Sequence, residues 1–360
     1  DRAPRVVRED DGGDSFLIDG MPGTIPLGII AAAGIPPEKI KTKGVPFEEL
    51  HRGGWDAKAR IADQDKDGIA GEIIYPSVGM MLCNHADADF KHACMWAYNG
   101  WLAEEFCAVA PDRLFGLGQT AVRSVAEAVE DMRKFKDMGF KGVMLPGSPA
   151  TEFDYHDKRF DPLWEASIAL DLPLSFHILT TKDGGVNPLD SLAKDTGPNS
   201  NTVKTIMFGN RLITALQNIV TQFIFGRVFE RHPKLKLVLV EADAGWAPHY
   251  ISRMNHAWDR HRYTLGVNDM TRKPSDYFLE NVYLTFQDDR VAWQTAHLMN
   301  PKRLMWANDF PHSDSTWPWS QDILRDHAQG LSDEVVGAII RDNMCELYNI
   351  PVPAGVKAVA

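Results

Sequence analysis

Four residues along the chain carry side chains that can bind a metal ion or move a proton, and they recur in one setting. His177, Glu241 and Asp309 each end a short apolar run, and His312 follows Asp309 three residues later. Imidazole and carboxylate groups are the usual ligands of divalent cations such as zinc, manganese and iron. The same groups serve as general acids and bases. These residues predict one metal-dependent catalytic site, provided that the fold brings the ends of the three runs together.

The apolar runs themselves have the length and composition of strands that are buried on both faces. Seven of them alternate with longer helical patterns, which indicates an α/β fold with a parallel sheet. The runs are 72–76, 114–120, 142–146, 174–177, 235–241, 282–286 and 304–309. Seven strands without a polar edge strand favour a (β/α)8 TIM-like barrel over an open sheet. Because such a barrel has eight strands, we expect the first strand to be missing from this sequence and to lie upstream of Asp1.

The carboxyl ends of the strands form the active-site face of a barrel of this kind. We therefore expect His177, Glu241 and Asp309 to meet there as metal ligands. Asp309, Glu241 and His312 are the candidate catalytic groups. His256, in the helical pattern that follows Glu241, is a candidate ligand of a second metal, with an exposed surface position as the alternative.

The chain is predicted to consist of three parts. Residues 1–60 form an irregular segment with a hairpin, 61–350 form the barrel, and 351–360 form a tail. The stretch 178–234 is too long for one crossover and should hold a loop and helices near the mouth of the barrel. Its Gly- and Pro-rich part, 183–201, has few large apolar residues and should be mobile.

The composition excludes several classes of protein. The chain has 360 residues, of which 44% are hydrophobic and 24% charged, as in globular proteins. Its formal net charge of −11 argues against nucleic acid or an anionic membrane as a partner. The four cysteines form no C-x-x-C pair, which is typical of reduced thiols in the cytoplasm. We expect a cytoplasmic enzyme that acts on a small molecule and assembles as a homo- or hetero-oligomer.

Longer motifs in the same regions resemble those of a known family. They are IAGEIIYPS, APDRLFGLGQTAV, GFKGVMLPG, VFERHP followed by KLKLVLVEADAGWAPHYISRM, LMWANDFPHSDSTWP, and a late Asn343. Together they resemble the amidohydrolase-2 family, the branch of the metal-dependent amidohydrolase superfamily that includes aminocarboxymuconate-semialdehyde decarboxylase. The resemblance implies a barrel enzyme that uses one or two divalent metal ions (Zn, Mn or Fe). It also implies hydrolysis or non-oxidative decarboxylation of a small organic acid.

The resemblance carries over to individual residues in three places. His177 matches the metal-ligand histidine that ends the fifth strand of the full barrel in this family. Asp309 matches the aspartate of the eighth strand, which binds metal and accepts a proton. Glu241 stands where many members have a histidine that acts in proton transfer. The D-x-H or H-x-H pair of the first strand has no counterpart after Asp1.

These departures leave two other functions open. Glu241 adds a negative charge and can bridge two metals, which suits an oxygenase (hydroxylase) with two Fe or Mn ions on the same fold. The absent first-strand pair is compatible with a catalytically silent scaffold subunit that pairs with an active paralogue. Among the site residues, Glu241 has the alternative of pairing with Arg253 behind the site. Asp288 and Asp289 either approach the metal or cap the next helix.

Overall fold

The computed structural model describes residues 2–181 and 200–352. Of the segment 183–201, which is predicted to be mobile, 183–199 lies outside the described residues. The described cysteines are free, as the sequence predicts.

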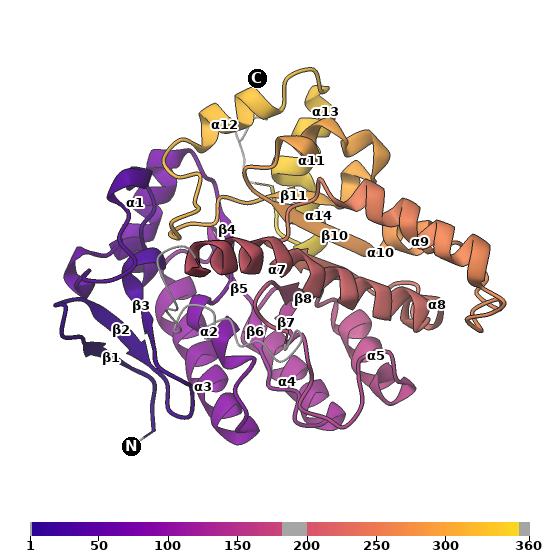
Figure 1. Ribbon diagram of the computed structural model, residues 1–360, viewed down its shortest axis with the longest axis horizontal. Helices are drawn as coiled ribbons and strands as arrows, with labels where there is room; N and C mark the ends of the chain where they lie inside the picture. The colour runs from indigo at the N-terminus through magenta and orange to yellow at the C-terminus, as the bar shows by residue number, and fades with distance from the viewer. Residues whose placement is uncertain (1, 182–199, 353–360) are drawn as a thin grey trace.

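Eight strand segments, each parallel to its sheet neighbours, form the centre of the fold (Figure 1). They are β4 (Glu72–Ile74), β5 (Leu114–Gly116), β6 (Gly118–Gln119), β7 (Val143–Met144), β8 (Leu174–His177), β9 (Leu237–Val240), β10 (Val282–Phe286) and β11 (Leu304–Trp306). β4 pairs with β5, and β6 to β11 pair in chain order. β5 and β6 belong to one run, interrupted at Leu117. Each of the seven predicted runs contains a strand, which confirms the parallel α/β sheet.

Helices alternate with these strands and cover the outside of the sheet (Figure 1). They are α1 (Ala57–Asp67), α2 (Ser77–Leu82), α3 (Ala88–Trp101), α4 (Val125–Asp137), α5 (Asp161–Leu170), α7 (Ser200–Phe225), α8 (Val228–Arg231), α9 (Ala247–His261), α10 (Pro274–Asn281), α11 (Arg290–Gln294), α12 (Ser320–His327), α13 (Asp333–Gly337) and α14 (Asn343–Tyr348). α7 and α8 are the helices predicted within 178–234.

Capping residues fix where the helices next to the site begin and end. Asp56 accepts hydrogen bonds from the first backbone N–H groups of α1, and Ser124 accepts one from the N–H of Glu127 in α4. α1 ends at Gly68, whose φ of +70° a residue with a side chain would rarely adopt. The chain then turns into β4. β4 pairs in parallel with β5, so the carboxyl ends of these two strands lie on the same side.

The two faces of each strand pack against different partners. On β9, Leu237 and Leu239 belong to the large core between the sheet and the outer helices. Val238 and Val240 belong to a second cluster inside the sheet, with Tyr283 of β10 among its members. Both faces of β9 are therefore filled with apolar side chains, and the polar chemistry of this strand is left to its end.

The N-terminal segment forms a small antiparallel sheet apart from the parallel one (Figure 1, indigo). Its strands are β1 (Arg5–Arg8), β2 (Asp14–Leu17) and β3 (Thr24–Pro26). The residues after β3 run beside the chain that follows β11. There Ala33 N–H donates to the Pro311 carbonyl at 3.0 Å, and Ser313 N–H donates to the Ile29 carbonyl at 3.0 Å. The segment expected to be irregular thus includes a sheet and supports the loop that carries Asp309.

Substituting Trp164 by alanine should destabilise the whole fold. Trp164 in α5 is fully buried and packs against Tyr155, Phe160 and Phe223. Removing so large a side chain leaves a cavity and typically costs about 3–5 kcal/mol. Urea denaturation of the variant should show a lower midpoint with an unchanged slope. A loss below about 1 kcal/mol would contradict this account of the core.

Candidate metal and active site

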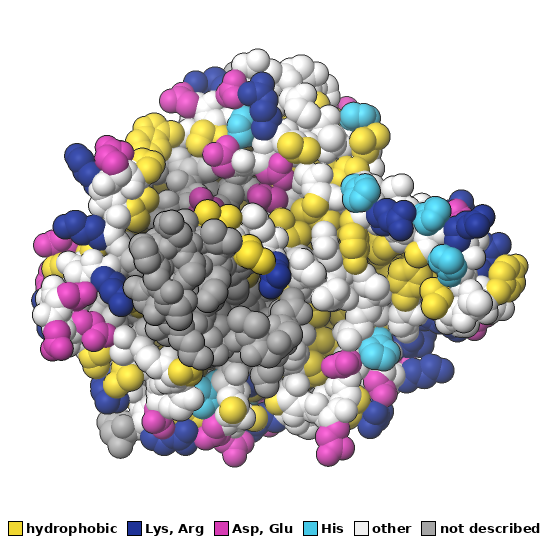
Figure 2. All heavy atoms as spheres, in the orientation of Figure 1, with side chains coloured by type: hydrophobic (Ala, Val, Ile, Leu, Met, Phe, Trp, Pro, Cys, Tyr) yellow, Lys and Arg dark blue, Asp and Glu magenta, His cyan; other side chains and the backbone are white. Residues whose placement is uncertain are grey.

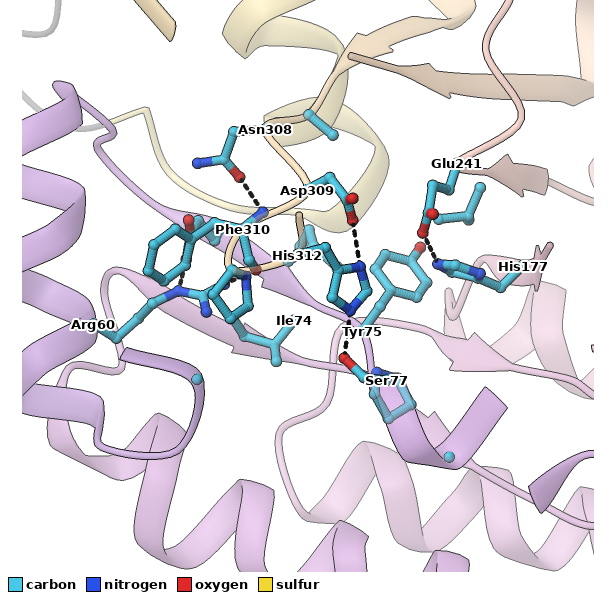
Figure 3. Close-up of a pocket in the computed structure, with 18 of the residues that line it drawn as sticks. Arg60, Ile74, Tyr75, Ser77, His177, Glu241, Asn308, Asp309, Phe310 and His312 are labelled. Atoms are coloured by element: carbon cyan, nitrogen blue, oxygen red, sulfur yellow. Dashed lines mark hydrogen bonds and ion pairs between the residues drawn. The ribbon is translucent and has the colours of Figure 1, made fainter. Parts of the chain in front are cut away.

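His177 lies at the carboxyl end of β8 and faces Glu241, the residue after β9 (Figure 3). Its side chain is 4% exposed, and its Nε2 lies 2.9 Å from Oε2 of Glu241. On the other side of the ring, Nδ1 donates to the Ile178 carbonyl at 3.0 Å. This bond places a proton on Nδ1 and directs Nε2 toward Glu241 and the strand ends. Metal-binding histidines are commonly oriented in this way.

Glu241 reaches the strand ends because the backbone leaves the strand conformation at that residue. Continued alternation would place its side chain with those of Leu237 and Leu239, on the helix-facing side of β9. Its φ is +58°, in the left-handed region that residues other than glycine seldom occupy. Thr285 on β10 holds this conformation, because its Oγ1 accepts the Glu241 N–H at 2.9 Å. The strain thus serves to direct the carboxylate toward His177.

Asp309, His312 and Ser77 form a chain of hydrogen bonds beside this pair (Figure 3). Oδ1 of Asp309 lies 3.1 Å from Nδ1 of His312, and Nε2 of His312 lies 2.8 Å from Oγ of Ser77. Asp309 also has a left-handed backbone, with φ +53°. Its other oxygen, Oδ2, is buried and has no hydrogen-bond partner among the described residues. These hydrogen bonds therefore leave Oδ2 of Asp309 available to a ligand.

Burial and the neighbouring charges shift the pKa values of these groups in different directions. Burial, together with the Glu241 carboxylate, raises the pKa of Asp309. Burial opposes the charged form of His312, but Asp309 and Glu241 overcome it and raise the pKa of His312 to about 9. Burial alone would raise the pKa of Glu241, but the adjacent His177 outweighs this effect and lowers the pKa of the carboxyl. The result is a compact group of charged side chains whose carboxylates could bind a cation.

The donor set fits a divalent metal ion. One ligand atom from each of Glu241, Asp309 and His312 lies within 4.8 Å of the others. His177 joins them through its contact with Glu241. The unpartnered Oδ2 of Asp309 is a buried acceptor that a cation would satisfy, since such an atom otherwise costs free energy. Two carboxylates and imidazole nitrogens suit Mn, Fe or Zn.

Arg60 on α1 holds the loop that carries Asp309 against β4 (Figure 3). Its Nη2 donates to the Phe310 carbonyl at 3.1 Å, and its Nε donates to Oε2 of Glu72 at 2.6 Å. The guanidinium also lies over the Phe310 ring, 4.5 Å from its centroid. A buried arginine with a carboxylate partner and a carbonyl acceptor fixes both elements that it joins.

A cavity of about 1020 Å³ opens beside these side chains. Both β4 and β11 contribute to its walls, and no strand joins these two strands in the part of the chain that the structure describes. His177, Glu241, Asp309, His312 and Ser77 all line it. A small molecule in this cavity would therefore contact the candidate ligands directly.

Other residues singled out in the sequence lie elsewhere. His256 and Arg253 are exposed on α9, where Figure 2 shows His and Arg side chains gathered on the projecting end of the molecule. The structure does not bring His256 to the strand ends, and Glu241 is paired with His177 rather than Arg253. Asp289 caps α11 by accepting a backbone N–H, and Asp288 is exposed. Helix periodicity alone cannot tell which helical side chains reach a site.

Three residues that shape the site were not among the sequence candidates. Ser77 follows the first apolar run, so the strand-end rule that selected His177 would have found it. Thr285 lies within a strand and Arg60 within a helix, and neither position differs in pattern from structural residues. Their roles depend on which elements the fold places side by side.

The parallel α/β sheet and the ligands at its strand ends define the class of barrel proteins with a candidate metal site at the carboxyl face. The chain belongs to the amidohydrolase-2 family, whose sequence model, described as amidohydrolase, matches residues 46–350. The family resemblance expected from the motifs is thereby confirmed.

Solved structures share this fold. The amidohydrolase map2389c from Mycobacterium avium subsp. paratuberculosis K-10 is 19% identical, with a TM-score of 0.74 over 96% of this chain and 92% of that chain. The 5-carboxyvanillate decarboxylase LigW from Sphingomonas paucimobilis is 22% identical (TM-score 0.62, 81% and 82%). A dihydroxybenzoic acid decarboxylase from Polaromonas sp. JS666, with bound manganese and the inhibitor 2-nitroresorcinol, is also 22% identical (TM-score 0.63, 82% and 86%). These likenesses confirm the TIM-barrel type of fold.

A comparison with curated proteins found no match. None of the helices in the described part of the chain combines the length and the apolar character that a membrane span requires. The group formed by Glu241, Asp309 and His312 agrees with the expected divalent-metal cofactor.

Proposed function

We propose that this protein is a metal-dependent, non-oxidative decarboxylase of a small aromatic carboxylic acid. The observation that carries the proposal is the buried Asp309 carboxylate, with one oxygen on His312 and the other, Oδ2, buried without a hydrogen-bond partner among the described residues. Similar structures described as benzoate-type decarboxylases support the choice of reaction and of substrate class.

His177, Glu241 and Asp309 would hold the metal ion. When bound, a divalent cation supplies a Lewis acid that binds and polarises substrate oxygens. The chain's own contribution is to fix the ligands before the substrate arrives. The Ile178 carbonyl orients the His177 ring, and Thr285 directs Glu241 toward it. Positioning of this kind lowers the entropic cost of reaching the reactive geometry.

His312 and Asp309 are placed to handle the proton that the reaction requires. In a non-oxidative decarboxylation, the bond between the ring carbon and the carboxylate carbon breaks, and CO2 leaves. The electron pair stays on the ring carbon, which then takes a proton. The proton shared between Nδ1 of His312 and Oδ1 of Asp309 lies at the cavity wall, and Ser77 fixes the opposite nitrogen of the ring. General acid catalysis of this kind typically contributes 10²–10⁴-fold.

The test is stoichiometric CO2 release. Protein loaded with Mn²⁺ should convert hydroxybenzoates to the corresponding phenols with one CO2 per substrate consumed, and chelator-treated protein should not. Hydrolysis of amides or esters without CO2 release would favour the hydrolase. Oxygen uptake with two redox metals per chain would favour the oxygenase. Metal-loaded protein that is inactive alone, but activates an added paralogue, would favour the scaffold subunit. The comparisons support neither of the last two alternatives.

Replacing Thr285 by valine should weaken metal binding about 10-fold while keeping the shape of the side chain. The substitution leaves the Glu241 N–H without its acceptor in a buried, left-handed turn, and residues that support metal ligands typically contribute 10–100-fold to affinity. Titration of chelator-treated protein with Mn²⁺ measures the change. Thr285→Ser keeps the hydroxyl and should bind Mn²⁺ as the unsubstituted protein does. Equal affinity in all three would show that Thr285 does not position Glu241.

A further inference from the structure

A second group of metal-binding side chains lies on the outer surface of the sheet, between α3 and α4. These helices lie side by side (Figure 1), and Trp96 of α3 packs against Phe135 of α4 with 5.4 Å between ring centroids. Glu127 and Asp131 are one turn apart on α4 and therefore share a face. His92 of α3 faces them. We propose that His92, Glu127 and Asp131 form a second metal site, which takes Zn²⁺ or a similar transition-metal cation and joins the two helices.

The distances suit one small cation. One ligand atom from each of the three residues lies within 4.8 Å of the others. Nδ1 of His92 lies 3.3 Å from Oε1 of Glu127. Ligand atoms around a tetrahedral zinc, at about 2.0–2.2 Å from the metal, lie about 3.3–3.6 Å apart, which matches the separation of His92 and Glu127.

His92 Nδ1 lacks the bond that a simple ion pair would provide. The atom is buried, and the structure gives it no hydrogen-bond partner in the described part of the chain, even though Glu127 is close. The ring nitrogen and the carboxylate thus approach each other without the alignment of a hydrogen bond. A cation between the two atoms would accept a lone pair from each and would satisfy the buried nitrogen.

Each carboxylate already has an outer hydrogen-bond donor. Arg123 donates to both oxygens of Glu127, with Nε at 2.9 Å from Oε1 and Nη2 at 2.5 Å from Oε2. Thr120 donates to Oδ2 of Asp131 at 2.7 Å. Metal-binding carboxylates are commonly held by such partners, which orient them and leave a further lone pair for the metal. Asp131 is only 2% exposed, so a cation would also stabilise a buried negative charge.

The donor set favours one class of metal. One imidazole nitrogen with two carboxylate oxygens suits Zn²⁺, Fe²⁺ or Co²⁺, whereas Ca²⁺ and Mg²⁺ prefer oxygen ligands alone. A cation here would join α3 to α4 far from the strand-end ligands in sequence. Binding at this site requires neither the proposed reaction nor its substrate.

Zinc titration of the full chain tests the site. Three chelator-treated proteins are titrated with Zn²⁺ by calorimetry: the unsubstituted protein, His92→Gln and His256→Gln. The last is the control, because His256 is an exposed histidine on α9. His92→Gln should bind one fewer equivalent of Zn²⁺, and His256→Gln should bind the full number. Asp309→Asn should retain the equivalent that His92→Gln loses, which separates this site from the strand-end site.

Thermal unfolding provides a second measurement. Zn²⁺ should raise the Tm of Asp309→Asn but not that of the double variant Asp309→Asn/His92→Gln. If His92→Gln does not fold, as judged by circular dichroism, Glu127→Gln should show the same loss of one equivalent. An unchanged number of sites and unchanged affinity in His92→Gln or its substitute would overturn the proposal. Complete loss of zinc binding in Asp309→Asn would also overturn it.

Discussion

Replacing His177 by alanine should remove the metal and the activity together while leaving the fold intact. His177 is buried at the end of β8, where its Nε2 faces Glu241 and its Nδ1 is fixed by the Ile178 carbonyl. Leu174 and Phe176 of the strand belong to the large apolar core, so loss of one ring at its end should not unfold the sheet. Metal analysis of protein purified without chelator, together with turnover, measures both effects. We expect the strand-end site to keep less than about a tenth of its wild-type metal, counted apart from any metal held by His92, Glu127 and Asp131, and no measurable turnover.

His256→Ala is the matched control, because His256 is an exposed histidine on α9. It should keep both metal and activity. Full metal occupancy in His177→Ala would show that the end of β8 does not bind the metal. Loss of cooperative unfolding in that variant would instead assign His177 a structural role.

Replacing Glu241 by glutamine should keep the shape of the site, weaken metal binding and lower turnover by about 100-fold or more. The change removes a negative charge that lies 2.9 Å from His177 and among the candidate ligands. A neutral amide oxygen is a poorer ligand for a hard divalent cation than a carboxylate. It also no longer supports the charged form of His312, whose pKa the Glu241 carboxylate helps to raise. Titration with Mn²⁺ and steady-state kinetics at saturating Mn²⁺ separate the loss of binding from the loss of turnover.

Normal metal binding in Glu241→Gln would contradict the role of Glu241 as a ligand. A full metal complement and near-normal turnover in Glu241→Gln would exclude Glu241 as a ligand. It would also exclude the hypothesis of an oxygenase in which Glu241 bridges two metal ions. A loss of stability with normal metal content would show that Glu241 acts through its pair with His177 alone. Glu334→Gln, an exposed glutamate in α13, is the control for the charge change itself.

The amino-acid sequence determined the order and type of the elements, because these depend on local periodicity and caps. All seven apolar runs contain strands, helices alternate with them as the longer helical patterns predict, and the helical pattern that follows Glu241 is α9. His177 and Asp309 could be selected because polar residues that end buried strands converge at one face of a parallel sheet. The same rule, applied to the first run, would have added Ser77.

The direction of Glu241 could not be read from its strand. Alternation along 235–241 groups it with Leu237 and Leu239, which pack toward the helices. A left-handed backbone at Glu241 itself reverses that direction, and a hydroxyl from the neighbouring strand stabilises it. A single dihedral angle outside the strand region has no signature in hydrophobic periodicity.

Contacts between distant segments were decided by the tertiary structure alone. Arg60 binds the Phe310 carbonyl across 250 positions in the sequence, and Ser77 binds His312 across 235. His256 shows the converse, since a plausible ligand type on a helix lies on the exposed side of α9. Residue type and local spacing therefore determined the elements and selected the strand-end candidate ligands His177, Glu241 and Asp309. Which further side chains meet at the site depended on how the sheet curves, where its strands end, and which loops pack against those ends, and these are properties of the whole folded chain.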